Sequence, residues 1–260
     1  MDVSLYFKRL KIDYEIECSF SHLCKLQRSH VYAVIFENLD IIKRKPLSLK
    51  IEDIFEKIVI QERGGVCFEL NGLFNFLLQA LGFDAFIVAA TVVCNEEEPI
   101  ENAHLTNIVK IDGNLFLVDV GYGVFTPMCL VPICGDIASD AMTDYRIRND
   151  AESGEKHLLL EHKRNEEWVT LYKFNLKPKC LKDFEQPLEH VQNGPNSLFV
   201  KNVFVSKICE NERWRLFGRT LLHYTKHERS DTEIDENHLS ETLQKYFQIS
   251  PQNCVSSYPT

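Results

Sequence analysis

The most regular alternation of apolar and polar positions in the chain lies between residues 67 and 81. There, apolar side chains recur every three or four residues, which is the spacing of one face of an α-helix. A second side of the same segment is also apolar. The first set is Cys67, Leu70, Phe74, Leu77, Leu78 and Leu81, and the second is Phe68, Leu73 and Phe76. The pattern predicts a helix that begins at Cys67 and is packed on most of its faces.

Other segments before residue 82 show the same spacing, whereas the middle of the chain does not. Helices are predicted at residues 5–10, 21–34 and 51–59, with a bend between helices at residues 36–38 and breaks at Pro46 and around Ser48. From residue 83 to about residue 180, short apolar runs joined by polar turns predict strands instead. These strands are expected at residues 85–93, 104–111, 115–120, 145–147, 156–161 and 167–176. Residues 133–144 are expected to form a loop, and the acidic segment at residues 95–102 is expected to be an exposed loop.

The last third of the chain mixes both patterns. A turn-rich break at residues 192–197 separates a predicted helix from a group of predicted strands. A final helix is expected to begin at Ser240 or a nearby capping residue. The elements are a helix at 181–190, strands at 198–208, 213–222 and 232–234, and a helix at 239–247.

Together these patterns predict an α+β fold with a three-part architecture. The parts are an N-terminal helical bundle at residues 1–82, a central β-barrel-like domain at 83–190, and a C-terminal α/β layer at 191–260. With 260 residues, 45% of them apolar, the chain is long enough for a large core or for two to three small domains.

An Asp-Gly pair at residues 112–113 stands between two of the apolar runs and is a strong hairpin signal. If the loop consists of only these two residues, counting back along both strands places Asp119 opposite Thr106. His104 is then a diagonal neighbour of Asp119 on the same face, within side-chain reach. A loop of odd length would send the two side chains to opposite faces. A purely structural polar pair would also explain them.

Cys67 is the second candidate for chemistry, because Gly64 and Gly65 precede it and allow a sharp turn at the helix start. The unpaired N–H groups there carry a partial positive charge that favours a thiolate, the nucleophilic form of cysteine. A cysteine in an apolar helix is also common as inert core filler. Cysteine, histidine and aspartate in this order nevertheless supply the nucleophile, base and orienting carboxylate of an acyl-transfer site.

The chain resembles the arylamine N-acetyltransferase family through four motifs spread along its length. The family pattern is Arg-Gly-Gly-x-Cys, a histidine that opens a strand, and Asp-x-Gly-Phe/Tyr-Gly. The matches are Arg63-Gly64-Gly65-Val66-Cys67, His104, Asp119-Val120-Gly121-Tyr122-Gly123, the early Phe36-Glu37-Asn38-Leu39, and the late segment Leu216-Phe217-Gly218-Arg219-Thr220-Leu221. The resemblance covers the chain from near its first residue to about residue 250.

This resemblance implies a cysteine-protease-like catalytic core under a C-terminal lid. It also implies ping-pong transfer of an acetyl group from acetyl-coenzyme A, without a metal, to an aromatic amine, hydroxylamine or hydrazine, as in xenobiotic metabolism. The roles that it implies are catalytic for Cys67, His104 and Asp119, acceptor-binding for Phe36, Val92 and Tyr122, coenzyme A-binding for Ser197 and Lys201, and structural support for Glu37 paired with Arg63.

Charge and cysteine content narrow the possible partners and the cellular location of the protein. The 38 acidic and 29 basic residues give a net charge of −9, and no basic stripe occurs, which argues against nucleic acid or an anionic membrane as the main partner. The nine cysteines are scattered without a zinc-binding spacing, which favours free thiols in a reducing compartment. The longest apolar run, residues 85–93, is too short to span a bilayer, and we find no leader pattern. The expected location is the cytoplasm.

Three other functions stay open from the residues alone. An amide synthase, or a thiol hydrolase or transglutaminase-like enzyme, would use the same triad with a different acceptor. A binding module that kept the fold would be expected to have lost a triad member, and none is missing here. Val66 stands where many members of the family carry an aromatic or larger residue, which leaves the acceptor preference open. The acyl length and the oligomeric state are also open.

Overall fold

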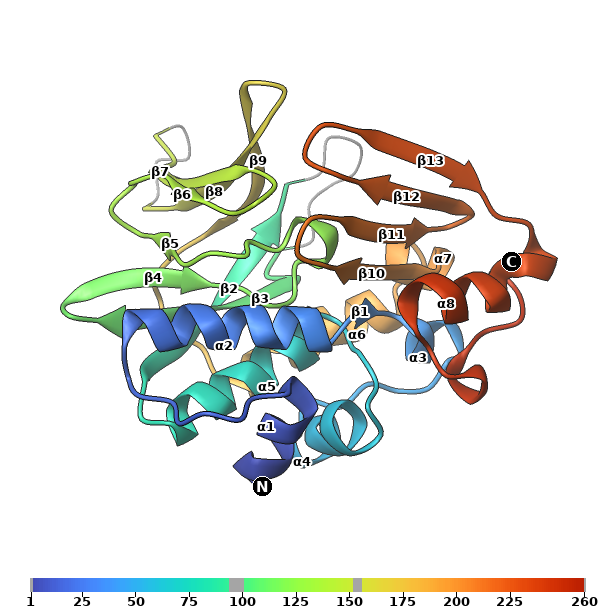
Figure 1. Cartoon of the computed structure of the whole chain (residues 1–260), viewed down its shortest axis with the longest axis horizontal. Coiled ribbons are helices and arrows are strands. Elements are labelled where there is room, and N and C mark those ends of the chain that lie inside the picture. Colours follow the sequence, from blue (N-terminus) through green and yellow to red (C-terminus); the bar gives the residue numbers. More distant parts are fainter. Residues whose placement is uncertain (1, 94–100, 152–155, 260) are drawn as a thin grey trace.

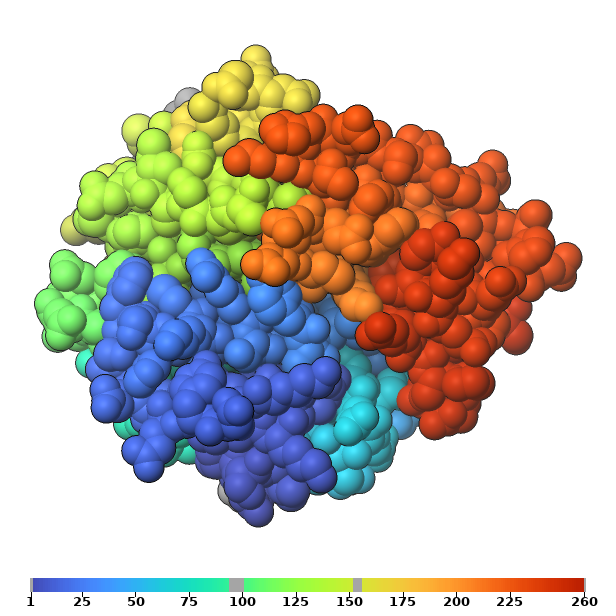
Figure 2. Space-filling view, in the orientation of Figure 1, coloured from blue at the N-terminus to red at the C-terminus, as the bar shows by residue number. Residues whose placement is uncertain are grey.

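The computed structural model describes residues 2–93, 101–151 and 156–259. The first third of the chain is helical, the middle is an eight-stranded sheet, and the last part is a five-stranded sheet next to a longer helix (Figure 1). The space-filling view shows the three parts packed against one another (Figure 2). The predicted three-part α+β architecture is confirmed. Within the described ranges, each helix is too short or too polar to cross a membrane.

Three of the helices before Cys67 were predicted and begin within two residues of their predicted starts, whereas the short helix at residues 39–42 was not predicted. Ser19 caps the second helix by accepting a hydrogen bond from the backbone of His22. The fourth helix is shorter than predicted, because residues 56–60 continue as a π-helical turn. The helices are α1 (Val3–Leu10), α2 (Phe20–Ala33), α3 (Leu39–Ile42), α4 (Ile51–Phe55) and α5 (Cys67–Ala80).

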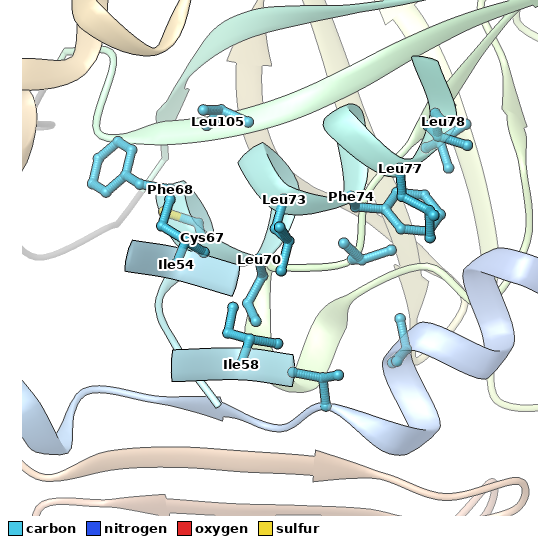
Figure 3. Close-up of a cluster of buried hydrophobic side chains, with 14 of the residues drawn as sticks. Ile54, Ile58, Cys67, Phe68, Leu70, Leu73, Phe74, Leu77, Leu78 and Leu105 are labelled. Atoms are coloured by element: carbon cyan, nitrogen blue, oxygen red, sulfur yellow. The ribbon is translucent and has the colours of Figure 1, made fainter. Parts of the chain in front are cut away.

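Helix α5 lies at the centre of the N-terminal core (Figure 3). It begins at Cys67, as the apolar spacing predicts, and both of its apolar sides are covered. Burying each large side chain contributes roughly 1.5–3 kcal/mol, so this helix is firmly held in place. The side chains with no exposed surface are Phe68, Leu70, Leu73, Phe74, Leu77 and Leu78.

The central sheet is antiparallel and curls toward closure. Its strand order is β5-β4-β3-β2-β9-β8-β7-β6, and β5 at one edge contacts β7 near the other. The short strands β5 and β6 were not predicted, and β6 lies inside the segment expected to be a loop. The strands are β2 (Asp84–Val92), β3 (His104–Ile111), β4 (Asn114–Val118), β5 (Val131–Pro132), β6 (Ala138–Ser139), β7 (Asp144–Asn149), β8 (Leu158–Arg164) and β9 (Glu167–Phe174).

The hairpin of β3 and β4 has the predicted two-residue loop, with Ile111 opposite Asn114. Both loop residues have positive φ values of 50° and 81°, as a type I′ turn requires. One position beyond β4, the chain reaches Asp119, which the register places opposite Thr106 with His104 one diagonal step away. The register prediction is therefore confirmed.

The C-terminal sheet, which we call the lid sheet, has the order β1-β10-β11-β12-β13. Its first strand is residues 36–37, so the prediction of a bend between helices at Phe36 was wrong; these residues pair with β10. The helix α8 packs on one face of the sheet. The elements are β1 (Phe36–Glu37), β10 (Phe204–Ile208), β11 (Arg213–Phe217), β12 (Thr220–Tyr224), β13 (Arg229–Glu233), α6 (Glu185–Asn193), α7 (Leu198–Lys201) and α8 (Leu239–Phe247).

Three details of this region differ from the sequence prediction. Residues 198–201 are helical, because the side chain of Ser197 caps α7. The single strand predicted at 213–222 is a hairpin, because Gly218 has a φ of 54° and reverses the chain. Helix α8 is entered through a 3₁₀ turn, Glu236–His238, rather than through a cap at Ser240.

The acidic segment around residues 95–102, expected to be an exposed loop, lies mostly outside the described residues.

Candidate active site

The loop before α5 holds Cys67 against the first strand of the lid sheet. A Cβ atom on Gly64 would lie 2.3 Å from the carbonyl oxygen of Ile35, so only glycine fits there. The backbone N–H of Glu37 donates to the carbonyl of Gly65 at 3.0 Å, which ties the loop to β1. Cys67 is only 6% exposed, so its thiol lies inside the protein and not on its surface.

His104 and Asp119 form a short contact beside this thiol. Nε2 of His104 lies 2.6 Å from Oδ2 of Asp119, and both side chains are buried. The Cys67 thiol lies beside the imidazole, and its Sγ donates to the carbonyl of Ala103 at 3.6 Å. Because Nε2 faces the carboxylate, Nδ1 is the ring nitrogen left for the sulfur. A Cβ atom on Gly121 would lie 3.1 Å from Cα of Cys67, so the Asp-x-Gly segment passes directly over the start of α5.

The ionisation of the pair follows from its surroundings. Burial alone would lower the pKa of His104, but the Asp119 charge, the hydrogen bond that the imidazole donates to Asp119 and the neighbouring Cys67 thiol outweigh burial and raise this pKa to about 10. Burial opposes the ionisation of Asp119, yet His104 lowers the pKa of the carboxyl below its usual value. At neutral pH the pair is therefore imidazolium and carboxylate.

Asp119 receives further hydrogen bonds from residues that the sequence analysis missed. Nδ2 of Asn71 donates to Oδ1 at 2.9 Å, and the hydroxyl of Tyr172 donates to Oδ2 at 2.8 Å. Oδ1 of Asn71 also accepts from the backbone of Val120 at 2.9 Å. Asn71 stands four residues after Cys67, on the same face of α5, and this spacing is the one signal that could have found it. The position of Tyr172 depends on pairing between distant strands.

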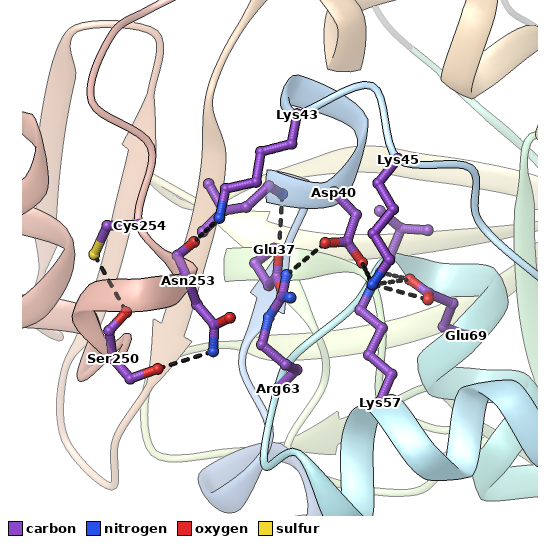
Figure 4. Close-up of polar contacts among 12 residues, drawn as sticks. Glu37, Asp40, Lys43, Lys45, Lys57, Arg63, Glu69, Ser250, Asn253 and Cys254 are labelled. Carbon is purple, nitrogen blue, oxygen red and sulfur yellow. Dashed lines mark hydrogen bonds and ion pairs between the residues drawn. The ribbon is translucent and has the colours of Figure 1, made fainter.

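A buried chain of five charged residues fixes the loop on its other side (Figure 4). Arg63 bonds Glu37 at 2.7 Å and Asp40 at 3.0 Å. Lys57 bonds Asp40 at 3.0 Å and Glu69 at 2.9 Å. Glu69 in turn accepts a hydrogen bond from the backbone of Val66, directly before Cys67. The network therefore links β1, α3, the π-helical turn and α5 around Cys67.

The sequence analysis expected the contact between Glu37 and Arg63 but not the other three members. Asp40 follows the early motif by only one residue, and Lys57 interrupts an apolar run at residues 54–59. A charge inside an apolar helical stripe signals a buried ion pair, but it does not identify the partner. Glu69 has no signal of this kind, because it lies two residues after the Arg63–Cys67 motif and the sequence does not indicate a partner for it.

Replacing Glu37 with glutamine should lower the free energy of unfolding by about 3 kcal/mol, because it removes one partner of a buried ion pair and leaves Arg63 undercompensated. Urea denaturation followed by circular dichroism measures this change. The matched control is Glu52→Gln, on the exposed side of α4, for which we expect a change below about 0.5 kcal/mol. An unchanged unfolding midpoint together with an unchanged rate of Cys67 acetylation would contradict the bracing role.

The three predicted acceptor-binding residues differ in how closely they contact the triad. The ring of Tyr122 packs edge-on against His104, with centroids 5.2 Å apart, and its hydroxyl donates to the carbonyl of Leu171. Val92 pairs with Tyr172 across β2 and β9, so the two side chains share a face. Phe36 packs against the aromatic rings of α7 and β10 and is not in ring contact with His104. Their roles in binding stay predictions.

The two predicted coenzyme A contacts have different surroundings. The Ser197 hydroxyl is buried, donates to the carbonyl of Val191 at 2.5 Å and accepts from the backbone of Phe199, so it is committed to the fold. Lys201 is exposed and bonds the side chain of Asn196 at 3.3 Å. The lysine is thus free to reorient toward a phosphate, whereas the serine is not.

A cavity of about 440 Å³ lies beside the loop that precedes α5. Arg63, Gly64 and Glu37 line it, but Cys67, His104 and Asp119 do not. It is therefore separate from these three side chains. Within the described residues, no group of three or more histidine, cysteine, aspartate or glutamate side chains is arranged to hold a metal ion.

Comparisons with known proteins show the family and the fold of the chain. The N-acetyltransferase family model matches residues 19–254. An arylamine N-acetyltransferase of Mycolicibacterium smegmatis is 30% identical over 245 residues, which cover 89% of this chain and 87% of that protein. The structure of the arylamine N-acetyltransferase from Mycobacterium abscessus is similar, with a TM-score of 0.90, 25% identity and coverage of 96% of this chain and 90% of that chain.

A second solved structure, the arylamine N-acetyltransferase of Mycobacterium marinum in complex with CoA, has a TM-score of 0.88 and 26% identity. It covers 97% of this chain and 96% of that chain. The family match spans most of the sequence, and the structural matches span all three parts of the fold. The chain therefore belongs to the arylamine N-acetyltransferase family of acyltransferases.

Proposed function

We propose that this protein transfers an acetyl group from acetyl-coenzyme A to an aromatic amine, hydroxylamine or hydrazine through a thioester on Cys67. The observation that carries the proposal is the buried contact of His104 with Asp119, 2.6 Å long, beside the thiol at the start of α5. A nucleophile, a base and an orienting carboxylate in hydrogen-bond contact are what acyl transfer requires.

In the first half of the reaction, His104 holds the proton of the thiol as an imidazolium. The Cys67 thiolate attacks the thioester carbonyl, and a tetrahedral intermediate forms. Backbone N–H groups in the first turn of α5, including that of Phe68, would stabilise its oxyanion. The intermediate collapses by breaking the bond to the coenzyme A sulfur, which leaves as a thiol after taking the proton from His104. Acetyl-Cys67 remains.

In the second half, the acceptor amine attacks the acetyl carbon, and His104 removes the proton that the nitrogen loses. Breaking the bond to Sγ releases the amide and restores the thiolate and imidazolium. Asp119 stays ionised throughout and holds the imidazole orientation. Asn71 and Tyr172 act as positioning residues, because they fix the carboxylate and do not touch the reacting atoms.

We also propose that the three predicted domains, residues 1–82, 83–190 and 191–260, each contribute to this site, with the last part covering it as a lid. The protein is proposed to act in the cytoplasm. Support for that location comes from the described cysteines, all of which are free thiols.

Intact-mass spectrometry tests the proposal directly. Incubation with acetyl-coenzyme A and no acceptor should add one acetyl group, which peptide mapping should locate on Cys67. Addition of an aromatic amine should return the protein to its original mass and release the N-acetyl product. A folded protein that gains no mass would contradict the proposal. An acetyl-enzyme that decays at the same rate with and without amines would favour a thiol hydrolase, and transfer only within a larger substrate would favour an amide synthase.

A further inference from the structure

A polar side chain, that of Gln27, interrupts the apolar face of α2. Gln27 lies on the buried face of the helix, where the spacing of Leu23, Leu26 and Val31 predicts another apolar residue. It has no exposed surface. A buried amide loses its hydrogen bonds to water, which is unfavourable unless groups of the protein replace them. The groups that replace them therefore indicate what this amide does.

The amide nitrogen of Gln27 joins the two ends of the segment that begins with Asp119. Nε2 donates to the backbone carbonyl of Asp119 at 3.1 Å and to that of Pro127 at 3.0 Å. Both partners are carbonyl oxygens, which only accept, so they fix the orientation of the amide. Among the described residues, the amide oxygen has no hydrogen-bond partner. The hydrogen bonds of this side chain thus go to residues 119–127 alone.

The central sheet does not hold the main-chain carbonyl of Asp119. Strand β4 ends at Val118, and its pairing with β3 ends at the same residue. Asn71 and Tyr172 bond the carboxylate of Asp119 and not this carbonyl. Gln27 therefore supplies the hydrogen bond that a strand ladder would otherwise give.

Residues 119–127 carry two side chains that contact His104. Oδ2 of Asp119 lies 2.6 Å from the imidazole, and the ring of Tyr122 lies 5.2 Å from it between centroids. Within the segment, the backbone of Tyr122 donates to Oγ1 of Thr126 at 2.9 Å. The two ends lie close together, because one nitrogen reaches both, so the segment is a compact loop. The amide from α2 therefore determines where this loop meets the imidazole.

We propose that Gln27 is a positioning residue for acyl transfer: its amide holds residues 119–127 so that Asp119 keeps His104 aligned with Cys67. This inference rests on the proposed acetyl transfer and adds a residue of α2 to that site. An apolar side chain of the same length would pack α2 equally well, so packing does not require an amide here. Misplacing a catalytic group by about 1 Å can lower a rate about 100-fold.

Replacing Gln27 with methionine tests the proposal, because methionine has a similar length and no N–H donor. The rate constant of Cys67 acetylation, measured by single-turnover thiol release, should fall about 10- to 100-fold. The concentration of acetyl-coenzyme A that gives the half-maximal rate should change less than about threefold, because the substitution misplaces the base and not the donor.

Proton NMR provides a second measurement, which needs no turnover. The proton between Nε2 of His104 and Oδ2 of Asp119 should give a resonance far downfield, because their 2.6 Å contact is short and charge-assisted. In Gln27→Met this resonance should move upfield or be lost through exchange with water. A residue that only packs α2 would leave it unchanged. Circular dichroism and thermal unfolding check that the variant is folded.

Gln79→Met is the matched control. Gln79 also donates from Nε2 to a backbone carbonyl, that of Ala85 at 3.0 Å, but it lies at the opposite end of α5 from Cys67. Its replacement should leave both the acetylation rate and the downfield resonance unchanged.

Gln27→Glu is the second variant. A carboxyl group buried at this position is protonated, so it donates to only one of the two carbonyls. Both effects should therefore be smaller than in Gln27→Met. If the methionine variant does not fold, the glutamate variant decides the proposal by the same two measurements.

A folded Gln27→Met protein with the acetylation rate and the resonance of the wild type would overturn the proposal. Equal rate losses in Gln27→Met and Gln79→Met would also overturn it, because they would reflect general destabilisation. So would an effect confined to the dependence on acetyl-coenzyme A concentration, which would assign Gln27 to the donor site. Failure of the wild type to form acetyl-Cys67 would contradict the proposed function, while the resonance would still decide the role of Gln27.

Discussion

Replacing Cys67 with serine should lower the rate of acetyl transfer by about 10⁴-fold or more, which is the scale of losing the nucleophile of a catalytic triad. A serine hydroxyl keeps its proton beside an imidazole that is already charged at neutral pH, so no anionic nucleophile forms. The assay is release of free coenzyme A thiol, with intact mass to show that no acetyl group is retained.

Cys129→Ser is the control for this substitution. Cys129 is buried like Cys67, but burial and the nearby charge of Asp140 raise the pKa of its thiol, so it stays protonated and inert. We expect full or nearly full activity from the control variant. A Cys67→Ser protein that kept a few per cent of the wild-type rate, or a Cys129→Ser protein that lost as much as Cys67→Ser, would exclude the proposed thioester route.

The sequence was sufficient where local chemistry decides the structure. The apolar spacing of α5 identified its first residue, and the Asp-Gly loop defined the register that brings His104 beside Asp119. In both cases, a short segment contains all the information. Two-residue turns permit one register, and an apolar stripe permits one buried face.

The sequence was not sufficient to predict the structure where contacts between distant segments decide it. Phe36 reads as part of a bend, because the partner that makes it a strand, β10, begins some 170 residues later in the chain. Residues 198–201 carry apolar side chains typical of a strand, but the cap at Ser197 turns them into a helix. The sequence analysis missed Tyr172, Lys57 and Asp40, because each acquires its role only through a partner in another element.

The charged network shows why motif residues alone underestimate the site. Arg63 belongs to the recognised motif, yet its position depends on Asp40 and Glu37, and the backbone before Cys67 depends on Glu69 and Lys57. If Cys67 is the nucleophile, as proposed, holding it by so many buried contacts preorganises it and lowers the cost of reaching the attacking geometry. The charged network and the contacts among Cys67, His104 and Asp119 therefore act together to fix the position of the Cys67 sulfur atom.

Replacing Asp119 with asparagine should lower the rate of Cys67 acetylation by about 10³- to 10⁴-fold while keeping the fold. The amide fills the same space, but its NH₂ group cannot accept the proton of Nε2, so the imidazole takes the other tautomer and can no longer accept a proton from Cys67. Single-turnover thiol release measures the loss. Tyr172→Phe removes one hydrogen bond to the same carboxylate and keeps its charge, so we expect a loss no greater than about tenfold.

The same substitution has a pH signature that separates it from simple misfolding. The pKa of His104 is raised to about 10 in the folded protein, above its unfolded value of 6.5. The stability that this shift contributes is therefore complete below about pH 6.5 and is lost as the pH rises toward about 10. The difference in unfolding free energy between wild type and Asp119→Asn should be larger near pH 6 than near pH 9.5, as urea denaturation at both values would measure. A difference independent of pH would mean that Asp119 does not hold the proton on His104, and the imidazolium would have to be removed from the mechanism.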